Sequence, residues 1–116
     1  MAKDNAEGVY SVSDYVPTTP IPKGADFAKR YKAKYDVESD FNSAMSYDAL
    51  SLAAEGLKKA GSTDKNAVRQ ALGGIKDFVG VATTYSFDEN RIGGTSVWLI
   101  QTKNGAPQII EQIKGR

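Results

Sequence analysis

The stretch from Asp40 to Gly61 constrains the fold more than any other part of this chain. Its polar residues recur at spacings of three and four, which places them in one stripe along a helix: Asp48, Ser51, Glu55, Lys58 and Lys59. The remaining positions are mostly apolar: Ala44, Met45, Tyr47, Ala49, Leu50, Leu52, Ala53, Ala54 and Leu57. We therefore predict a helix over residues 43–60 that is covered on most sides, with Ser43 as its N-cap and Gly61 at its C-terminal end.

The rest of the chain divides into predicted helices and strands. Apolar residues at helical spacing predict two further helices, over residues 25–35 and 64–73. β-Branched and aromatic residues predict four strands, over residues 7–15, 79–87, 96–102 and 108–113. Three prolines predict an extended connector without helix over residues 16–24. Lys103, Asn104 and Gly105 predict a hairpin turn between the last two strands.

Composition excludes several classes of function. The 116 residues suit one domain, residues 1–116, and the formal charge of +1 argues against nucleic acid as a partner. The chain has no Cys and no His, so thiol and imidazole chemistry and Cys/His zinc sites are excluded. The polar turn over residues 88–94 fails the calcium-loop spacing, because Ile92 occupies a ligand position. We expect no enzymatic activity, no metal and no cofactor.

Several sequence blocks, in this order, carry a resemblance to a known family: AEGVYSVSDYVP, FAKRYKAKYDVESDF, AMSYDALSLAAEGLKKAGSTDKNAVRQAL, IKDFVGVATTYSFDEN and SVWLIQTKNG. Together they resemble the C-terminal third of the branched-chain amino-acid type of periplasmic substrate-binding protein of ABC transporters, the two-lobed type I class. The resemblance implies an α/β fold with about three helices packed on a small mixed sheet of about four strands, a fragment of the type I fold. It also implies that residues 13–17 and 81–87 are adjacent hinge crossovers between the lobes, which we expect to pair through their backbones.

The same resemblance implies a function. The parent protein would be the solute-binding component of an amino-acid uptake system, with an amino acid or related small molecule as ligand and an ABC permease as partner. It would lie in the periplasm, or outside the cell on a lipid anchor. The polar start MAKDNAEG has no signal-peptide core, so we expect that the leader is absent from this chain or that the protein is cytosolic.

The resemblance also implies a ligand-facing patch just before the central helix: Phe41, Asn42, Ser43, Ala44 and Tyr47. Family members often place an aromatic side chain at the position of Asn42, where it closes over the ligand. Asn at this position departs from that pattern and leaves room for a more polar ligand. For Tyr47 an alternative stays open, because an aromatic residue on a buried helix is more often part of a core.

A second interpretation belongs to a different class of protein. The chain would fold alone as a truncated module that binds no small molecule and associates with itself. Its strands would form one four-stranded sheet with the helices on one face. Apolar helix flanks left exposed would favour a homo-oligomer, most simply a dimer.

Overall fold

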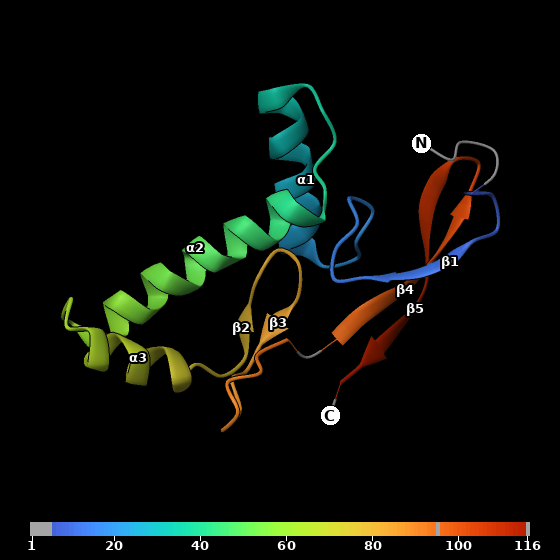
Figure 1. Ribbon diagram of the computed structural model, residues 1–116. Helices are drawn as coiled ribbons and strands as arrows, with labels where there is room; N and C mark the ends of the chain where they lie inside the picture. The colour runs from blue at the N-terminus through green and yellow to red at the C-terminus, as the bar shows by residue number, and fades with distance from the viewer. Residues whose placement is uncertain (1–5, 95, 116) are drawn as a thin grey trace.

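The computed structural model describes residues 6–94 and 96–115 of the chain. The elements follow one another as β1 (Tyr10–Ser13), α1 (Pro22–Tyr35), α2 (Phe41–Ala60), α3 (Lys65–Gly73), β2 (Phe78–Val79), β3 (Thr84–Tyr85), β4 (Ser96–Lys103) and β5 (Ala106–Lys114). The predicted α/β class, three helices with a small sheet, is confirmed. Figure 1 shows the three helices on one side of the molecule and β1, β4 and β5 on the other.

The strands form two separate antiparallel sheets. β1 and β5 flank β4 in the larger one, with Val12 opposite Leu99, and β2 pairs only with β3. The turn between β4 and β5 is the predicted one, because Asn104 and Gly105 both have positive φ angles, 53° and 73°. The strand predicted over residues 79–87 is wrong, since this stretch instead contains the end of β2, a turn at residues 80–83 and β3.

The expected hinge pairing between residues 13–17 and 81–87 is also wrong at the level of the backbone. β1 pairs with β4, and Thr84–Tyr85 pairs with Phe78–Val79. The two segments still meet through side chains, because Tyr15 packs in one hydrophobic cluster with Val81 and Ala82. Their role as hinge crossovers stays a prediction.

Helix α1 begins three residues earlier than predicted, inside the stretch that we expected to be extended. Pro22 is its first residue. Proline is tolerated there because the first N–H groups of a helix have no partner within the helix, and the fixed φ of the ring suits the helical turn. The helix ends at Asp36, which adopts a left-handed conformation and donates its N–H to the Lys32 carbonyl.

Helix α2 begins at Phe41, and its N-cap is Asp40 rather than Ser43. The Asp40 carboxylate accepts a hydrogen bond from the Ser43 N–H at 2.8 Å, and the Ser43 hydroxyl accepts one from the Asp40 N–H at 2.9 Å. Ser43 therefore takes the third position of a reciprocal capping box. At the other end Gly61 has φ 59° and closes the helix as predicted.

The polar and apolar faces of α2 differ from the prediction. Asp48, expected in the polar stripe, is only 1% exposed, whereas Leu50 is 74% exposed. The buried stripe of α2 runs at intervals of four residues: Ala44, Asp48, Leu52 and Gly56. Gly56 lets α3 approach closely, because a Cβ atom there would lie 2.6 Å from a methyl group of Leu72. The helix is therefore covered on one side and open on another.

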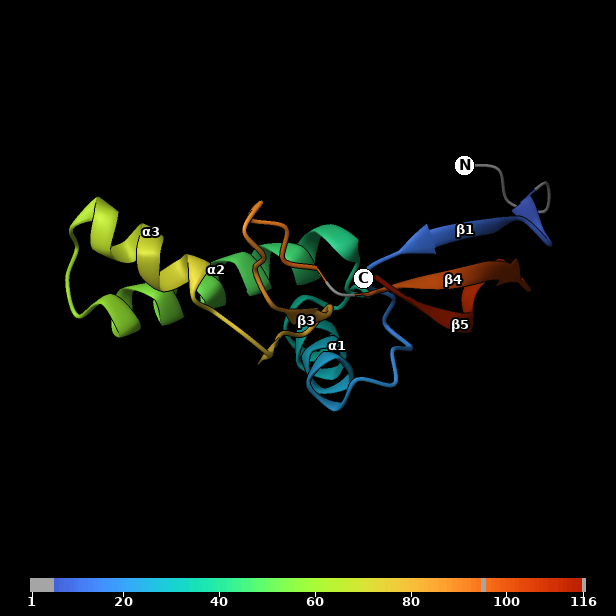
Figure 2. The ribbon, with the colours of Figure 1, turned by 90° about the horizontal axis from the view of Figure 1, so that it is seen from below.

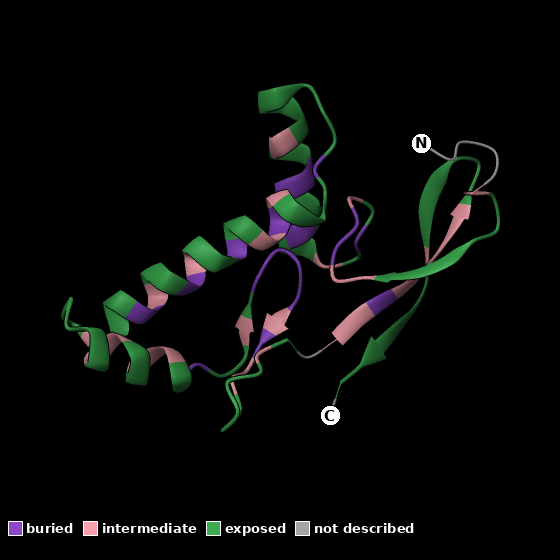
Figure 3. Ribbon diagram, in the orientation of Figure 1, coloured by how far each residue is buried: buried purple, intermediate pink, exposed green. Residues whose placement is uncertain are grey.

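Two hydrophobic clusters lie where the helices meet the β2–β3 hairpin (Figure 3). The first is formed by Tyr15, Phe27, Ala44, Val81 and Ala82. The second is formed by Leu52, Ile75 and Tyr85, with Leu72, Phe78 and Phe87 packed against it. In the larger sheet, Trp98 is the buried hydrophobic residue among those described in β1, β4 and β5.

The molecule is extended, as two perpendicular views show (Figures 1 and 2). Its radius of gyration is 16.1 Å and its extents are 51 × 35 × 24 Å. A compact domain of this length has a radius of gyration of about 13 Å. The chain thus leaves more surface uncovered than a domain of its size usually does. Among the described residues, no helix is both long enough and apolar enough to span a membrane.

Candidate functional site

A cavity of about 520 Å³ lies at the junction between the larger sheet and the helices; we call it the junction cavity. Three parts of the chain far apart in sequence meet there. They are the connector after β1 (Ser13, Tyr15, Val16, Pro17 and Thr18), the entry into α2 (Glu38, Ser39, Asp40 and Phe41) and the β4–β5 hairpin (Ile100, Ala106, Pro107 and Gln108). The capping box fixes the second part, and the two positive φ angles of the hairpin turn fix the third.

Polar groups line one side of this cavity. The Tyr15 hydroxyl and the Ser39 hydroxyl share a buried hydrogen bond of 2.7 Å. Burial raises the pKa of Tyr15, so this phenol stays neutral at physiological pH. The Ser43 N–H, by donating to Asp40, lowers the pKa of that carboxyl group, which therefore stays ionised. The junction cavity is thus lined by neutral hydroxyl groups and by the Asp40 carboxylate, and Glu38, in an ion pair with Lys32 at 3.2 Å, also borders it.

Other residues that line the junction cavity are apolar. Val16 and Pro17 come from the connector, and Ile100 and Pro107 come from the hairpin. An apolar wall facing a few fixed polar groups is the usual composition of a small-molecule site. A ligand with a cationic group and an aliphatic part would satisfy both sides. No group of three or more potential metal-ligating residues occurs among the residues that the structure describes.

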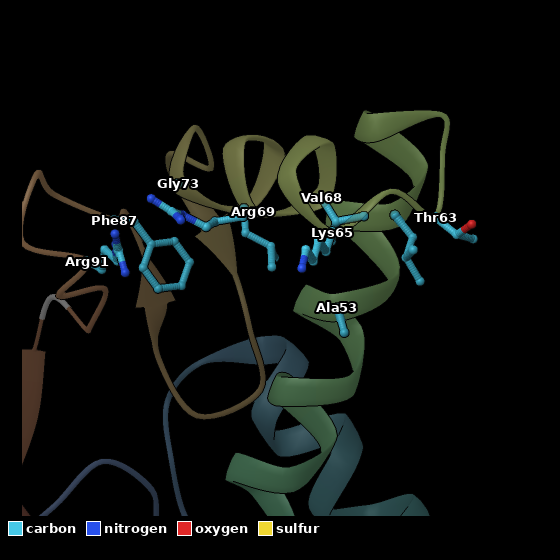
Figure 4. Close-up of a pocket in the computed structure, with 10 residues that line it drawn as sticks. Ala53, Thr63, Lys65, Val68, Arg69, Gly73, Phe87 and Arg91 are labelled. Atoms are coloured by element: carbon cyan, nitrogen blue, oxygen red, sulfur yellow. The ribbon is translucent and has the colours of Figure 1, made fainter.

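Two other grooves flank α2. One of about 470 Å³ lies between α1 and α2, and one of about 610 Å³ lies between α2, α3 and the loop after β3 (Figure 4). Cationic side chains stand at both, Arg30 and Lys34 at the first and Lys65, Arg69 and Arg91 at the second. We place the candidate site in the junction cavity, because there the sheet and the helices both contribute walls and the lining combines apolar residues with the Asp40 carboxyl group.

The five residues predicted to face a ligand do not gather in one cavity. Phe41 lines the junction cavity, whereas Ser43 and Tyr47 line the groove between α1 and α2. Asn42 is exposed and does not line the junction cavity, and Ala44 is fully buried in the first hydrophobic cluster. Tyr47 is 39% exposed, with its ring centroid 5.0 Å from that of Phe27.

Sequence reasoning missed the buried carboxylate of Asp48. Its two oxygens accept hydrogen bonds from the N–H groups of Val81 and Ala82, at 2.7 and 2.9 Å, and one of them also accepts from the Tyr85 hydroxyl at 3.0 Å. Two effects raise the pKa of Tyr85: burial is the larger, and the negative charge of Asp48 is the next. The phenol therefore keeps its proton and remains a donor. Asp48 thereby fastens the turn at residues 80–83 to α2. Its spacing of four from Ala44 and Leu52 was the available signal.

Comparison with known families decides which class of protein this is. The sequence profile of the family described as "Periplasmic binding protein" matches residues 1–107. The chain belongs to the periplasmic binding protein family. No curated protein matches the chain.

Solved structures of periplasmic binding proteins have the same fold. The leucine-binding protein LivK of Thermotoga maritima is 28% identical with a TM-score of 0.83, and the match covers 93% of this chain and 31% of that protein. The branched-chain amino-acid substrate-binding protein LivJ of Streptococcus pneumoniae, solved with isoleucine, is 28% identical with a TM-score of 0.82 over 95% of this chain and 31% of that one. A substrate-binding protein of Desulfitobacterium hafniense, solved with leucine, is 27% identical with a TM-score of 0.79. The match covers 92% of this chain and 32% of that one.

The chain spans about a third of the length of these solved structures. The predicted resemblance to part of a type I binding protein is confirmed, and the matched proteins are binding proteins of ABC transporters, not enzymes. The identity of the ligand of this periplasmic binding protein, and the residues that contact it, stay predictions.

Proposed function

We propose that this chain forms one side of the ligand cleft of a solute-binding protein that delivers amino acids to an ABC permease. The observation that carries the proposal is the junction cavity, where the N-terminus of α2, the connector after β1 and the β4–β5 hairpin converge on about 520 Å³ of space. Leucine and isoleucine occur in solved relatives with the same fold. Family membership supports a periplasmic location for the parent protein. The alternative location that we propose for the parent is outside the cell, on a lipid anchor.

The chemistry of the cavity favours an amino acid as ligand. Asp40 is ionised, and its charge at the cavity edge suits an ammonium group. The apolar wall formed by Val16, Pro17 and Ile100 suits an aliphatic side chain. Within the patch that the family resemblance implied, Phe41 borders this space, and Asn42, Ser43, Ala44 and Tyr47 complete the same stretch of helix.

One side of a cleft cannot surround a zwitterion, so the isolated chain should bind its ligand weakly. Charged groups lose affinity when their hydration is only partly replaced. We expect a dissociation constant of roughly 1 mM or higher for leucine, equivalent to about 4 kcal/mol or less of binding free energy.

The test is a titration of the isotope-labelled chain with L-leucine, followed by amide chemical shifts. The expected result is that shifts are confined to the junction cavity, at Phe41, Ile100 and Gln108, and that Phe41→Ala reduces them. Val79→Ala is the matched control, because Val79 is exposed and lies outside this cavity. Shifts confined to other surfaces, or none at 20 mM leucine, would contradict the proposal.

A second candidate is the self-associating module without a small-molecule ligand. Its support is the exposed area of the chain, 7884 Å². A compact monomer of 12.5 kDa exposes about 6,200 Å². The excess is more than about 1,000 Å², and a stable interface needs about 800 Å² from each partner. Sedimentation velocity tests this candidate: a dimer is expected at micromolar concentration, and a monomer at 100 µM would contradict it.

A further inference from the structure

The turn between β4 and β5 contains a sequence that is prone to chemical modification. Among the asparagines of the chain, only Asn104 is followed by glycine. Asn104 and Gly105 are both exposed, and both have positive φ angles, as the central residues of a two-residue hairpin turn do. Glycine has no side chain to crowd its backbone nitrogen, and asparagine is among the thermolabile residues. The residues that form the turn are thus also the ones most open to loss of the side-chain amide.

The carboxylate of Glu7, from the segment before β1, holds this turn. Its Oε1 accepts a hydrogen bond from the Asn104 N–H at 3.1 Å, and its Oε2 accepts one from the Gly105 N–H at 3.4 Å. We call these two contacts the Glu7 clamp. The Gly8 N–H donates to the Thr102 carbonyl at 2.8 Å and thereby keeps Glu7 beside the turn.

Deamidation of an asparagine uses the backbone of the residue that follows it. The backbone nitrogen attacks Cγ of the asparagine side chain, so that an N–Cγ bond forms and the Cγ–Nδ2 bond breaks. The backbone proton leaves with the departing ammonia. Water then opens the resulting five-membered imide at one of its two C–N bonds, which leaves aspartate or isoaspartate. The reaction consumes only water and needs no oxidant, metal or enzyme.

Two effects of the Glu7 clamp slow this reaction. The ring closes only when the Asn104 backbone rotates and brings the Gly105 nitrogen toward Cγ, and this rotation takes the Gly105 N–H away from Glu7. The attacking nitrogen also gives up its proton, and a neighbouring carboxylate disfavours the negative charge that develops there. We propose that Asn104 is a deamidation site of this protein and that the Glu7 clamp controls its rate.

The modification reverses the effect of the clamp. Both products carry a carboxylate on residue 104, next to the N–H that Glu7 accepts from, and like charges repel. Isoaspartate also lengthens the main chain within a turn whose length sets the register of the hairpin. Deamidation therefore loosens the contact between the segment before β1 and the turn, and the step is one-way because ammonia is lost to the solvent.

Asn42 provides a comparison within the same chain. It is exposed as well, but the next residue is Ser43, whose N–H donates to the Asp40 carboxylate at 2.8 Å in the capping box of α2. Attack by this nitrogen would break the cap and open the first turn of the helix. Asn42 should therefore deamidate more slowly than Asn104.

Incubation of the folded chain at mildly alkaline pH, followed by peptide mass spectrometry, measures the rate at each asparagine. Glu7→Ala is expected to speed deamidation of Asn104 roughly fivefold, as the loss of hydrogen bonds to an exposed carboxylate would. Glu111→Ala is the matched control, because Glu111 is an exposed carboxylate in the same sheet that pairs with Leu99, away from the turn. It should leave the rate unchanged. Circular dichroism verifies that both variants fold.

Amide hydrogen exchange tests the effect of the product. Asn104→Asp reproduces one of the two products without the wait. It should speed exchange of the Gly8 amide by about threefold or more, because the segment before β1 opens more often. The amide of Trp98, in the middle of β4, should exchange as it does in the wild type.

Several outcomes would overturn the inference. An Asn104 that stays intact in both the wild type and Glu7→Ala is not a deamidation site. Deamidation of Asn42 as fast as that of Asn104 would remove the special role of the turn. Equal rates at Asn104 in the wild type and Glu7→Ala, or equal acceleration by Glu7→Ala and Glu111→Ala, would show that the clamp does not control the reaction. Unchanged exchange of Gly8 in Asn104→Asp would contradict the loosening of the turn.

Discussion

The carboxylate of Asp48 organises the centre of the molecule at the scale of single residues. Three donors converge on it, two of them backbone N–H groups of the turn at residues 80–83. Because Val81 and Ala82 donate to this carboxylate, their N–H groups are not available to a β-ladder. One buried side chain therefore converts a β-branched, strand-like sequence into a hairpin with a tight turn.

Asp48→Asn should destabilise the chain by about 2–4 kcal/mol. The amide that replaces one oxygen is itself a donor and would face backbone N–H groups, and buried hydrogen bonds to a charged acceptor contribute about 1.5–3 kcal/mol each. Urea unfolding at a fixed protein concentration measures the change. Glu55→Gln, on the same helix in a loose 3.8 Å ion pair with Lys59, is the control and should change stability by less than about 0.5 kcal/mol. Equal effects of the two substitutions would contradict a special role for Asp48.

Gly80→Ala should destabilise the chain by about 1–3 kcal/mol, because overpacking in a close-packed interior forces its neighbours to shift. A Cβ at Gly80 would lie 2.6 Å from Cγ of Asp48. Gly73→Ala is the matched control: it lies in α3, and nothing lies within 4 Å of its added Cβ. There alanine should leave stability unchanged or raise it by up to about 1 kcal/mol, since it favours helix more than glycine does. Thermal denaturation compares the stability of the two variants. A Gly80→Ala variant more stable than the wild type would show that the turn does not pack closely against Asp48.

At the scale of elements, the start of α2 depends on a titratable cap. The hydrogen bond from Ser43 lowers the pKa of Asp40 below its usual 3.8, so the ionised carboxylate is bound more favourably in the folded state. For a lowered pKa, the stabilisation is complete above the unfolded-state value and is lost as the pH falls through the folded-state value.

Asp40→Asn should therefore reduce the loss of thermal stability between pH 5 and pH 2.5. Asparagine can still cap the helix but does not titrate. Melting temperatures of both proteins across this range give the comparison. If the variant loses as much stability in acid as the wild type does, the cap contributes nothing to the acid sensitivity of α2.

At the scale of the whole molecule, stability should be unevenly distributed. Both hydrophobic clusters lie among the helices, the connector and the β2–β3 hairpin, whereas β5 is mostly exposed and forms an edge of the larger sheet (Figure 3). Segments with few buried apolar contacts open at lower free energy. The shape in Figure 1 thus combines a packed helical part with a thinly covered sheet.

Amide hydrogen exchange should show this difference. The slowest amides are expected in the middle of α2, around Leu52, and at Val81 and Ala82, where the donors are buried. Amides of β5 should exchange at least tenfold faster. Equal protection of β5 and α2 would contradict this uneven distribution of stability.

The sequence by itself determined the local structure and the family. Periodicity located all three helices, Gly61 ended α2, and the Asn104–Gly105 pair determined the hairpin, because these features depend on backbone preferences over a few neighbouring residues. The order of the sequence blocks led to the type I periplasmic binding proteins, and the comparisons confirm that the chain belongs to the periplasmic binding protein family.

Only the tertiary structure decided which side of each helix is covered. Asp48 and Leu50 exchanged their expected places, because burial depends on the partners that the rest of the chain supplies and not on residue type alone. The same limit applies to the candidate site. Phe41 reaches the junction cavity and Ala44 enters the core three residues later, a difference set by the direction in which α2 meets the connector and the hairpin.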